Sequence, residues 1–321
     1  MRILLWHVHG SWTTAFVQGP HEYLVPVLPD RGPDGRGRAQ TWDWPGSVRE
    51  VTPEALVVEE FDLVVLQRPH EVDLVAAWTG RRPGIDVAAV YVEHNTPVPH
   101  PTDTRHPVAD RGDIHLVHVT HFNRMNWDNG AAPATVIEHG ICDPGQQWTG
   151  DIDRLAIAIN EPIRRNRVVG ADLLPLFAQT AGLDVFGMSV TGVGARYGIP
   201  ADRCREFEDL PQGAMHRELA RRRVYVHTAR WTSLGLSLLE AMHLGMPVVV
   251  LAATEAPRAV PAEAGCVSSD LTELIDAVGH LHSDPIAAAH AGDVARAFAL
   301  KHYGVNRFLH DWEDLIEEVV A

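Results

Sequence analysis

Lysine is almost missing from this chain: Lys301 is the only one among 27 basic residues. The base composition of the gene explains the scarcity, but the scarcity still has a chemical consequence. A phosphate site far from Lys301 has to take its cation from arginine or histidine. Arginine binds phosphate through a planar bidentate fork, whereas lysine acts as a point charge. Any phosphate site near the N-terminus or in the middle of the chain is therefore expected to contain arginine or histidine.

Cysteine is also scarce, and the three residues Cys142, Cys204 and Cys266 are widely spaced. This number and spacing exclude a disulfide framework and a cysteine-based zinc site. No apolar run approaches the roughly 20 residues needed to span a bilayer, and residues 1–7 are too quickly polar for a signal peptide. We therefore expect a cytoplasmic protein without an integral membrane segment.

A basic surface is missing as well, because the net charge is −15, which argues against a nucleic-acid partner. No Gly-x-Gly-x-x-Gly follows an early strand, so a dinucleotide oxidoreductase is disfavoured. The length of 321 residues and the hydrophobic content of 45% instead favour two domains with sizeable cores.

Apolar runs alternate with helical patterns along the chain, which predicts an α/β protein with parallel sheets. The expected strands are 2–8, 61–67, 87–92, 115–119, 135–137, 155–159, 183–186, 224–227 and 248–251. The expected helices are part of 13–27, then 71–78, 122–127, 169–180, 213–221, the segment after residue 235, 271–281, 286–300 and 305–319, with a loop at 29–50. A composition break at 140–150 indicates a linker. The predicted domains are 1–147 and 148–302, followed by a helical segment, 303–321.

The most informative segment is 232–251, which reads TSLGLSLLEAMHLGMPVVVL. Gly235 opens a predicted helix that ends at Gly245, and Pro247 leads into a strand. The first turn of a helix offers unpaired amides and a partial positive charge, which bind phosphate, and Ser237 can donate a further hydrogen bond. Glu240 is suited to accept hydrogen bonds from a pair of ribose hydroxyls. The alternative is an ordinary helix–strand unit with a solvated glutamate.

This segment closely resembles the signature of family 4 glycosyltransferases of the GT-B fold, also known as glycosyl transferases group 1. The matching positions are Gly235, Leu236, Leu238, Leu239, Glu240, Ala241, Met242, Gly245, Pro247, Val248 and Val249. The resemblance implies two Rossmann-like domains that face each other across a cleft, with the C-terminal helix, 303–321, crossing back to the N-terminal domain. It assigns ribose binding to Glu240. The first glutamate of the signature, which usually contacts hydroxyls of the donor sugar, is replaced here by Thr232.

Two further segments resemble elements of the same family. Residues 135–144, TVIEHGICDP, are similar to the element before its linker, and residues 160–172, NEPIRRNRVVGAD, to its arginine–lysine element. The second resemblance places Arg164 on the family arginine and Val169 on the family lysine, so Arg165 or Arg167 is expected to compensate. A solvated basic turn is the alternative.

The N-terminal half offers His94, which ends a predicted strand and resembles the family histidine near the donor sugar. Gly10 and Ser11 follow the first strand and are expected near the diphosphate and the acceptor, with a tight strand–helix turn as the alternative. His115, His118 and His121 are spaced by three, but a strand places such residues on opposite faces, which disfavours a metal site.

The resemblance therefore implies a retaining glycosyltransferase that moves a sugar from a nucleoside-diphosphate sugar, UDP- or GDP-linked, to a glycan, lipid or small-molecule acceptor. It implies no metal and no further cofactor. The expected catalytic residues are His94, Thr232 and Arg164. The expected donor-binding residues are Gly10, Ser11, Arg164, Arg165, Arg167, Ser233, Leu234, Gly235, Leu236, Ser237 and Glu240. A degenerate, non-catalytic binding protein, a nucleotide-sugar epimerase of the same fold, and a homodimeric state stay open.

Overall fold

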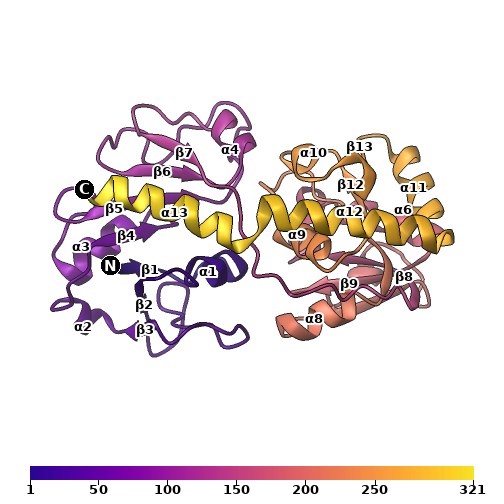
Figure 1. Ribbon diagram of the computed structural model, residues 1–321, viewed down its shortest axis with the longest axis horizontal. Coiled ribbons are helices and arrows are strands. Elements are labelled where there is room, and N and C mark those ends of the chain that lie inside the picture. Colours follow the sequence, from indigo (N-terminus) through magenta and orange to yellow (C-terminus); the bar gives the residue numbers. More distant parts are fainter. The chain divides into compact units, whose positions relative to one another are not determined.

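The computed structural model describes the whole chain, Met1–Ala321, and divides it into two compact units. The first unit combines Met1–Cys142 with Val305–Ala321, and the second is Asp143–Gly304. These divisions lie within a few residues of the predicted boundaries at 147 and 302. Both units are built from strands and helices that alternate along the chain (Figure 1).

The first unit contains a seven-stranded sheet in the order β3-β2-β1-β4-β5-β6-β7, with every neighbouring pair parallel. Its strands are β1 (Arg2–Leu5), β2 (Glu22–Pro26), β3 (Val48–Val51), β4 (Leu63–Leu66), β5 (Ala88–Glu93), β6 (His115–His118) and β7 (Ala134–Val136). Its helices are α1 (Gly10–Phe16), α2 (Pro53–Leu56), α3 (Glu71–Thr79), α4 (His121–Asn126) and α13 (Val305–Val320).

The last helix of the chain, α13, packs on α1 and β5 of the first unit (Figure 1). The contact is aromatic: the Trp312 ring of α13 meets Phe16 of α1 edge-on, with ring centres 4.9 Å apart, and Trp12 of α1 edge-on at 5.8 Å. Gly140 permits close approach, because a Cβ there would lie 2.3 Å from the Cβ of Phe308. Residues from both ends of the chain therefore complete one hydrophobic core.

The second unit contains a six-stranded parallel sheet in the order β10-β9-β8-β11-β12-β13. Its strands are β8 (Ile152–Ala158), β9 (Gly182–Gly187), β10 (Cys204–Glu208), β11 (Arg222–His227), β12 (Val248–Leu251) and β13 (Gly265–Ser268). Its helices are α5 (Pro162–Arg165), α6 (Leu174–Thr180), α7 (Val193–Arg196), α8 (Gln212–Leu219), α9 (Leu236–His243), α10 (Ala256–Ala259), α11 (Leu271–Ser283) and α12 (Pro285–Tyr303), with three short 3-10 turns at Asn166–Val169, Ala171–Leu173 and Ala262–Ala264.

Each sheet has one point at which the order of successive strands reverses, and such a point is the usual place for a ligand in parallel sheets. In the first sheet the reversal lies between β1 and β4, and in the second between β8 and β11. Loops that leave the carboxyl ends of these neighbours diverge, and the crevice between them is the usual ligand site of such sheets. The predicted α/β class with two Rossmann-like parallel sheets is confirmed.

The sequence prediction was wrong at sheet edges and at the first helix. Glu22–Pro26 is a strand rather than part of a helix, and three further strands, β3, β10 and β13, were not predicted. Two of them, β3 and β10, are edge strands with charged residues, so they lack the continuous apolar run of a central strand. β1 ends at Leu5 and Gly10 is the first residue of α1, so the segment between them lies at residues 6–9, earlier than expected.

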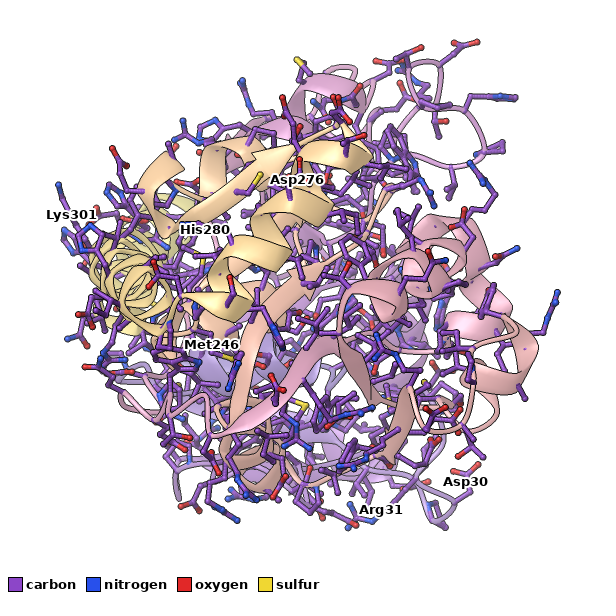
Figure 2. All side chains as sticks on the ribbon, turned by 90° about the vertical axis from the view of Figure 1, so that its right-hand side faces the viewer. Asp30, Arg31, Met246, Asp276, His280 and Lys301 are labelled. Carbon is purple, nitrogen blue, oxygen red and sulfur yellow. The ribbon has the colours of Figure 1, made fainter.

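No helix of the structure combines the length and the apolar character needed to cross a membrane. Lys301 lies exposed on α12, whereas Asp276 and His280 lie on the neighbouring helix α11 (Figure 2). The only lysine is therefore not on the loops that follow β8 and β11, where the second sheet reverses.

Candidate functional site

Glu240 lies in α9, just beyond its first turn, and only 3% of its surface is exposed. Helix α8 supplies polar partners: Gln212 Nε2 donates to Glu240 Oε1 at 3.1 Å, and His216 Nε2 lies 3.3 Å from Oε2. A buried carboxylate with such partners is held in one position rather than free in solvent. The alternative interpretation of Glu240 as a solvated surface glutamate is therefore wrong.

The start of α9 is shaped by a close contact between Gly235 and His227. Gly235 is the N-cap, and a Cβ at this position would lie 2.4 Å from Cε1 of the His227 ring. Because no larger residue fits here, the backbone can enter α9 directly above the imidazole. The amides of Leu236 and Ser237, in the first turn, have no acceptor within the helix. They are the amides for which the sequence predicts anion binding, and that binding stays a prediction.

The Ser237 hydroxyl is used inside the unit instead of pointing to a ligand. It accepts a hydrogen bond from the Tyr225 hydroxyl at 3.0 Å and donates to the Ala158 carbonyl at 3.2 Å. Since a hydroxyl has one hydrogen, the expected further donation to a ligand is not available in this structure. Ser237 instead fixes α9 to the carboxyl end of β8, and its amide stays a candidate.

The three arginines after β8 have different partners. Arg164 pairs with Glu161, and Arg167 with Asp172 at 2.8 Å, and each of these arginine side chains is 71% exposed. Arg165 is half-buried and has no ion pair, and burial, followed by the neighbouring Arg164, lowers its pKa below the ordinary value for arginine. Arg165 is therefore the cation of this loop that is free to pair with an anion.

The segments after β8 and β11 leave the sheet on either side of the reversal point, and they are hydrogen-bonded to each other. Thr228 Oγ1 donates to the Val169 carbonyl at 2.8 Å, and Arg230 pairs with Asp172. Gly170 adopts a positive φ of 71°, and a Cβ there would lie 2.0 Å from the Thr228 carbonyl oxygen. The Gly170 and Asp172 positions of the resembled element thus have structural roles, and Val169, only 2% exposed, is a core residue.

The remaining predicted residues of this unit lie between β11 and α9. Thr232 is half-buried, and Ser233 and Leu234 are buried in the irregular segment that precedes Gly235. Leu236 is the first residue of α9. The structure thus brings Thr232 and the start of α9 together at the reversal point of the second sheet.

In the first unit, His94 follows β5 and is 8% exposed. Its ring lies against His9, which follows β1, with ring centres 4.0 Å apart, and against the edge of Trp12. Burial lowers the pKa of His94 well below its ordinary value, and the neighbouring His9 and His139 lower it further. Burial also lowers the pKa of His9 to about 4 and that of His139 to about 3. These three imidazoles are therefore neutral at physiological pH.

Gly10 and Ser11 start α1 beside this cluster, which we call the histidine cluster and define as His9, His94 and His139. A Cβ on Gly10 would lie 3.3 Å from the Trp42 ring, so the indole covers this glycine. The expected contacts of Gly10 and Ser11 with a diphosphate stay a prediction.

No role was predicted from the sequence for the polar residues that contact the predicted site residues. Gln212 and His216 contact Glu240 from another helix, Gln67 contacts His94 from another strand, and His227 lies against Gly235. Only His227 carried a signal, because it directly precedes the loop of the recognised signature. The other contacts depend on how elements pack.

No group of three or more histidine, cysteine, aspartate or glutamate side chains is placed to hold a metal ion. Of the three regularly spaced histidines, His118 donates from Nε2 to Asn129 Oδ1 at 2.8 Å, His115 is on the same strand and His121 begins α4. Their spacing does not form a metal-binding cluster.

Comparison with known proteins places this geometry in a class. Residues 205–284 match the family model described as glycosyl transferases group 1. No curated protein sequence matches the chain. The matched residues run from β10 through α9 to α11, so they contain Glu240 and the start of α9.

Solved structures match over the full length at low identity. Sucrose-phosphate synthase from Thermosynechococcus elongatus is 13% identical, with a TM-score of 0.75, and the match covers 99% of this chain and 98% of that one. HepE of Anabaena in complex with UDP is 15% identical, with a TM-score of 0.69 and coverage of 99% and 100%. AviGT4, a glycosyltransferase involved in avilamycin A biosynthesis, is 15% identical, with a TM-score of 0.67 and coverage of 100% and 98%.

These findings define the class: the chain has the GT-B fold of glycosyltransferases. Its segment 205–284 matches the model of group 1 glycosyl transferases, the family that residues 232–251 resemble. The family match therefore supports a glycosyltransferase function of the GT-B type.

Proposed function

We propose that this chain is a retaining glycosyltransferase that transfers a sugar from a nucleoside-diphosphate sugar to a hydroxyl-bearing acceptor. The observation that carries the proposal is the buried Glu240, fixed just beyond the first turn of α9 at the reversal point of the second sheet. A carboxylate held in this way accepts hydrogen bonds from two adjacent ribose hydroxyls. The first-turn amides of α9 then bind the diphosphate.

Arg165 supplies the positive charge for the diphosphate in this proposal. Its guanidinium makes no ion pair, and the residue ends the short helix α5 in the segment after β8, which is hydrogen-bonded to the loop that leads to α9. The bond between the sugar and the diphosphate breaks more easily when the negative charge of the leaving group is stabilised. The only lysine lies on α12, so arginine has this role here.

The donor base and the retaining chemistry rest on the likeness to known glycosyltransferases. HepE of Anabaena has been solved with UDP and with UDP-glucose, which makes UDP the first nucleotide to test. In the retaining mechanism, the departing phosphate takes the proton of the acceptor hydroxyl on the same face of the sugar. The family resemblance assigns a contact with the sugar to His94 and puts Thr232 in place of the usual glutamate, and the proposed reaction needs no metal.

Calorimetric titration with UDP, GDP, ADP and dTDP tests the nucleotide site. We expect one nucleotide to bind, and Glu240→Gln to weaken its binding by about tenfold to a hundredfold, because hydrogen bonds to a charged group contribute about 1.5–3 kcal/mol. Glu263→Gln, at an exposed glutamate of the same unit, is the control and should leave binding unchanged. If none of the four nucleotides binds the wild-type protein, the proposal is wrong.

A non-catalytic nucleotide-binding protein is the second candidate. Two observations favour it: Thr232 stands where the family has a sugar-contacting glutamate, and Val169, at the family lysine, is buried in the core. Slow hydrolysis of the donor sugar separates the two candidates. An enzyme releases free sugar from its nucleotide-sugar in the absence of an acceptor, whereas a protein that only binds the nucleotide does not.

A further inference from the structure

Hydrogen bonds join three polar groups in a row: the Trp6 carbonyl, the Gln67 amide and the His94 imidazole. Gln67 directly follows β4, His94 directly follows β5, and these strands are neighbours in the first sheet. Gln67 is 4% exposed and His94 is 8% exposed. The side-chain oxygen of Gln67 lies 3.1 Å from His94 Nε2, and its side-chain nitrogen donates to the Trp6 carbonyl at 2.7 Å. The hydrogen bond to the Trp6 carbonyl restricts the orientation of the Gln67 amide, and the amide in turn restricts His94.

The orientation of the Gln67 amide is determined by the Trp6 carbonyl. This carbonyl also accepts the backbone N–H of Val8 at 3.1 Å, so it is an acceptor in two hydrogen bonds. A reversed amide would place the Gln67 oxygen against the Trp6 oxygen, with no proton between them. The backbone N–H of Gln67 donates to the buried Glu71 carboxylate at 2.6 Å, which fixes the residue at the strand end.

The fixed amide determines which nitrogen of His94 carries the proton. Because the Gln67 oxygen can only accept, the Nε2 atom of His94 has to donate. A neutral imidazole has a single N–H, so Nδ1 then carries a lone pair and no proton. No hydrogen bond is made to His94 Nδ1 within the structure.

We propose that Gln67 is a positioning residue that fixes His94 as the neutral Nε2–H tautomer, so that Nδ1 accepts a hydrogen bond from a hydroxyl of a bound sugar. The sugar as the ligand rests on the proposed function, whereas the tautomer does not. A sugar hydroxyl donates one hydrogen bond and carries no charge, which suits a neutral acceptor at the end of a buried strand.

The groups that face His94 from neighbouring segments keep it neutral. They are His9 after β1, His139 after β7 and Trp12 of α1, and none of them is a carboxylate. Burial and the two histidines lower the pKa of His94, and no nearby anion stabilises the imidazolium. The neutral tautomer therefore persists as the pH is lowered through the usual pKa range of histidine.

Long-range ¹H–¹⁵N spectra of the histidine-labelled full chain test the tautomer directly. The His94 signals are assigned by their loss in His94→Asn. We expect a protonated Nε2 and an unprotonated Nδ1 in the wild type, unchanged between pH 8 and pH 6. In Gln67→Met, which has a similar volume but no amide oxygen, we expect a second tautomer. A protonated Nδ1 in the wild type, or an unchanged tautomer in Gln67→Met, would overturn the proposal.

Hydrolysis of UDP-glucose gives a second readout. We expect Gln67→Met to reduce kcat by about tenfold, as expected when one hydrogen-bonded group is no longer held in position, with a normal thermal transition. If Gln67 acts through His94, the double variant with His94→Asn should be no slower than His94→Asn alone. Additive losses would contradict the positioning role. A wild-type protein that does not hydrolyse UDP-glucose would count against the proposed donor, while the spectra still decide the tautomer.

Discussion

At the scale of single residues, the arginines after β8 look equivalent in the sequence but have different partners in the structure. Arg165 lacks an ion pair, whereas Arg164 is paired with Glu161. We expect Arg165→Gln to weaken UDP binding by about tenfold to a hundredfold, the range for hydrogen bonds to charged groups. Binding of uridine, which has no phosphate, should not change. Calorimetry with both ligands measures the difference.

Arg164→Gln is the matched control for this prediction. Because its guanidinium is exposed and already paired, its loss should change UDP affinity by no more than about twofold, as expected for an exposed ion pair of about 0–1 kcal/mol. If Arg164→Gln is the more damaging variant, then the pair with Glu161 opens on binding and Arg164 is the phosphate ligand, as the family resemblance implied.

Which residues form the candidate site could be predicted only in part. Glu240 could be singled out as a candidate because the signature around it is local in the sequence. Its partners could not be predicted, since Gln212 lies 28 residues away on α8 and contacts Glu240 only through packing. The same holds for Gln67 and His94, which are 27 residues apart and meet because their strands are neighbours.

At the scale of elements, the start of α9 depends on the absence of a side chain at residue 235. We expect Gly235→Ala to reduce nucleotide binding by at least about tenfold, because a methyl group placed 2.4 Å from the His227 ring forces the first turn of the helix to move. Calorimetry with the best-binding nucleotide measures the loss. The double variant Gly235→Ala with His227→Ala should recover part of it, since the ring that is in the way is removed.

Gly279→Ala, in the interior of α11, controls for the general effect of replacing a glycine. No atom lies within 4 Å of the position that its Cβ would take. The substitution should leave nucleotide binding unchanged and stabilise the protein by about 0.5–1 kcal/mol, because alanine is the better helix former. Equal losses of binding in both glycine variants would contradict the role given to residue 235.

The helices and strands that could be predicted from the sequence are those in which burial determines the pattern of apolar residues. The central strands β4 and β5 are buried along almost their whole length and read as apolar runs. The edge strand β10, with the sequence CREFE, has half-buried and exposed residues and carries no such run. Helix α13 was readable because its apolar residues recur at helical spacing, although the sequence did not show that Trp312 packs on Phe16.

At the scale of the whole molecule, buried neutral histidines make the folded state sensitive to acid. Burial lowers the pKa of His9 and of His118 to about 4 and that of His139 to about 3, all in the first unit. In the unfolded chain these groups titrate near pH 6.5, so the unfolded state binds more protons between pH 6.5 and about 4. Stability is therefore complete above pH 6.5 and falls as the pH is lowered towards 4.

Calorimetric unfolding at several pH values checks this expectation. In the second unit, the pKa is lowered to about 4 for only one histidine, His227. The unfolding transition of the second unit should therefore shift less with pH than that of the first unit. His118→Asn should make the first-unit transition less dependent on pH between 6.5 and 4. A first-unit midpoint that does not change between pH 7.5 and pH 5 would contradict the prediction.

The return of the chain to its first unit makes α13 part of that unit's core, although α13 follows the second unit in the sequence. Trp312 is 1% exposed and packs on Phe16 and Trp12 of α1. We expect Trp312→Ala to lower the free energy of unfolding of the first unit by about 3–5 kcal/mol, because it leaves a large cavity in an aromatic core. Nucleotide binding by the second unit should be kept.

Urea unfolding followed by the fluorescence of the remaining tryptophans, together with calorimetric binding of the nucleotide, separates these two effects. Glu317→Ala, at an exposed position of the same helix, should change stability by less than about 0.5 kcal/mol. If α13 were only a surface appendage, both variants would behave alike. A large effect of Trp312→Ala alone would show that the first unit acquires its full stability only after the second unit has been synthesised, since the residues that complete the first core follow the second unit in the sequence.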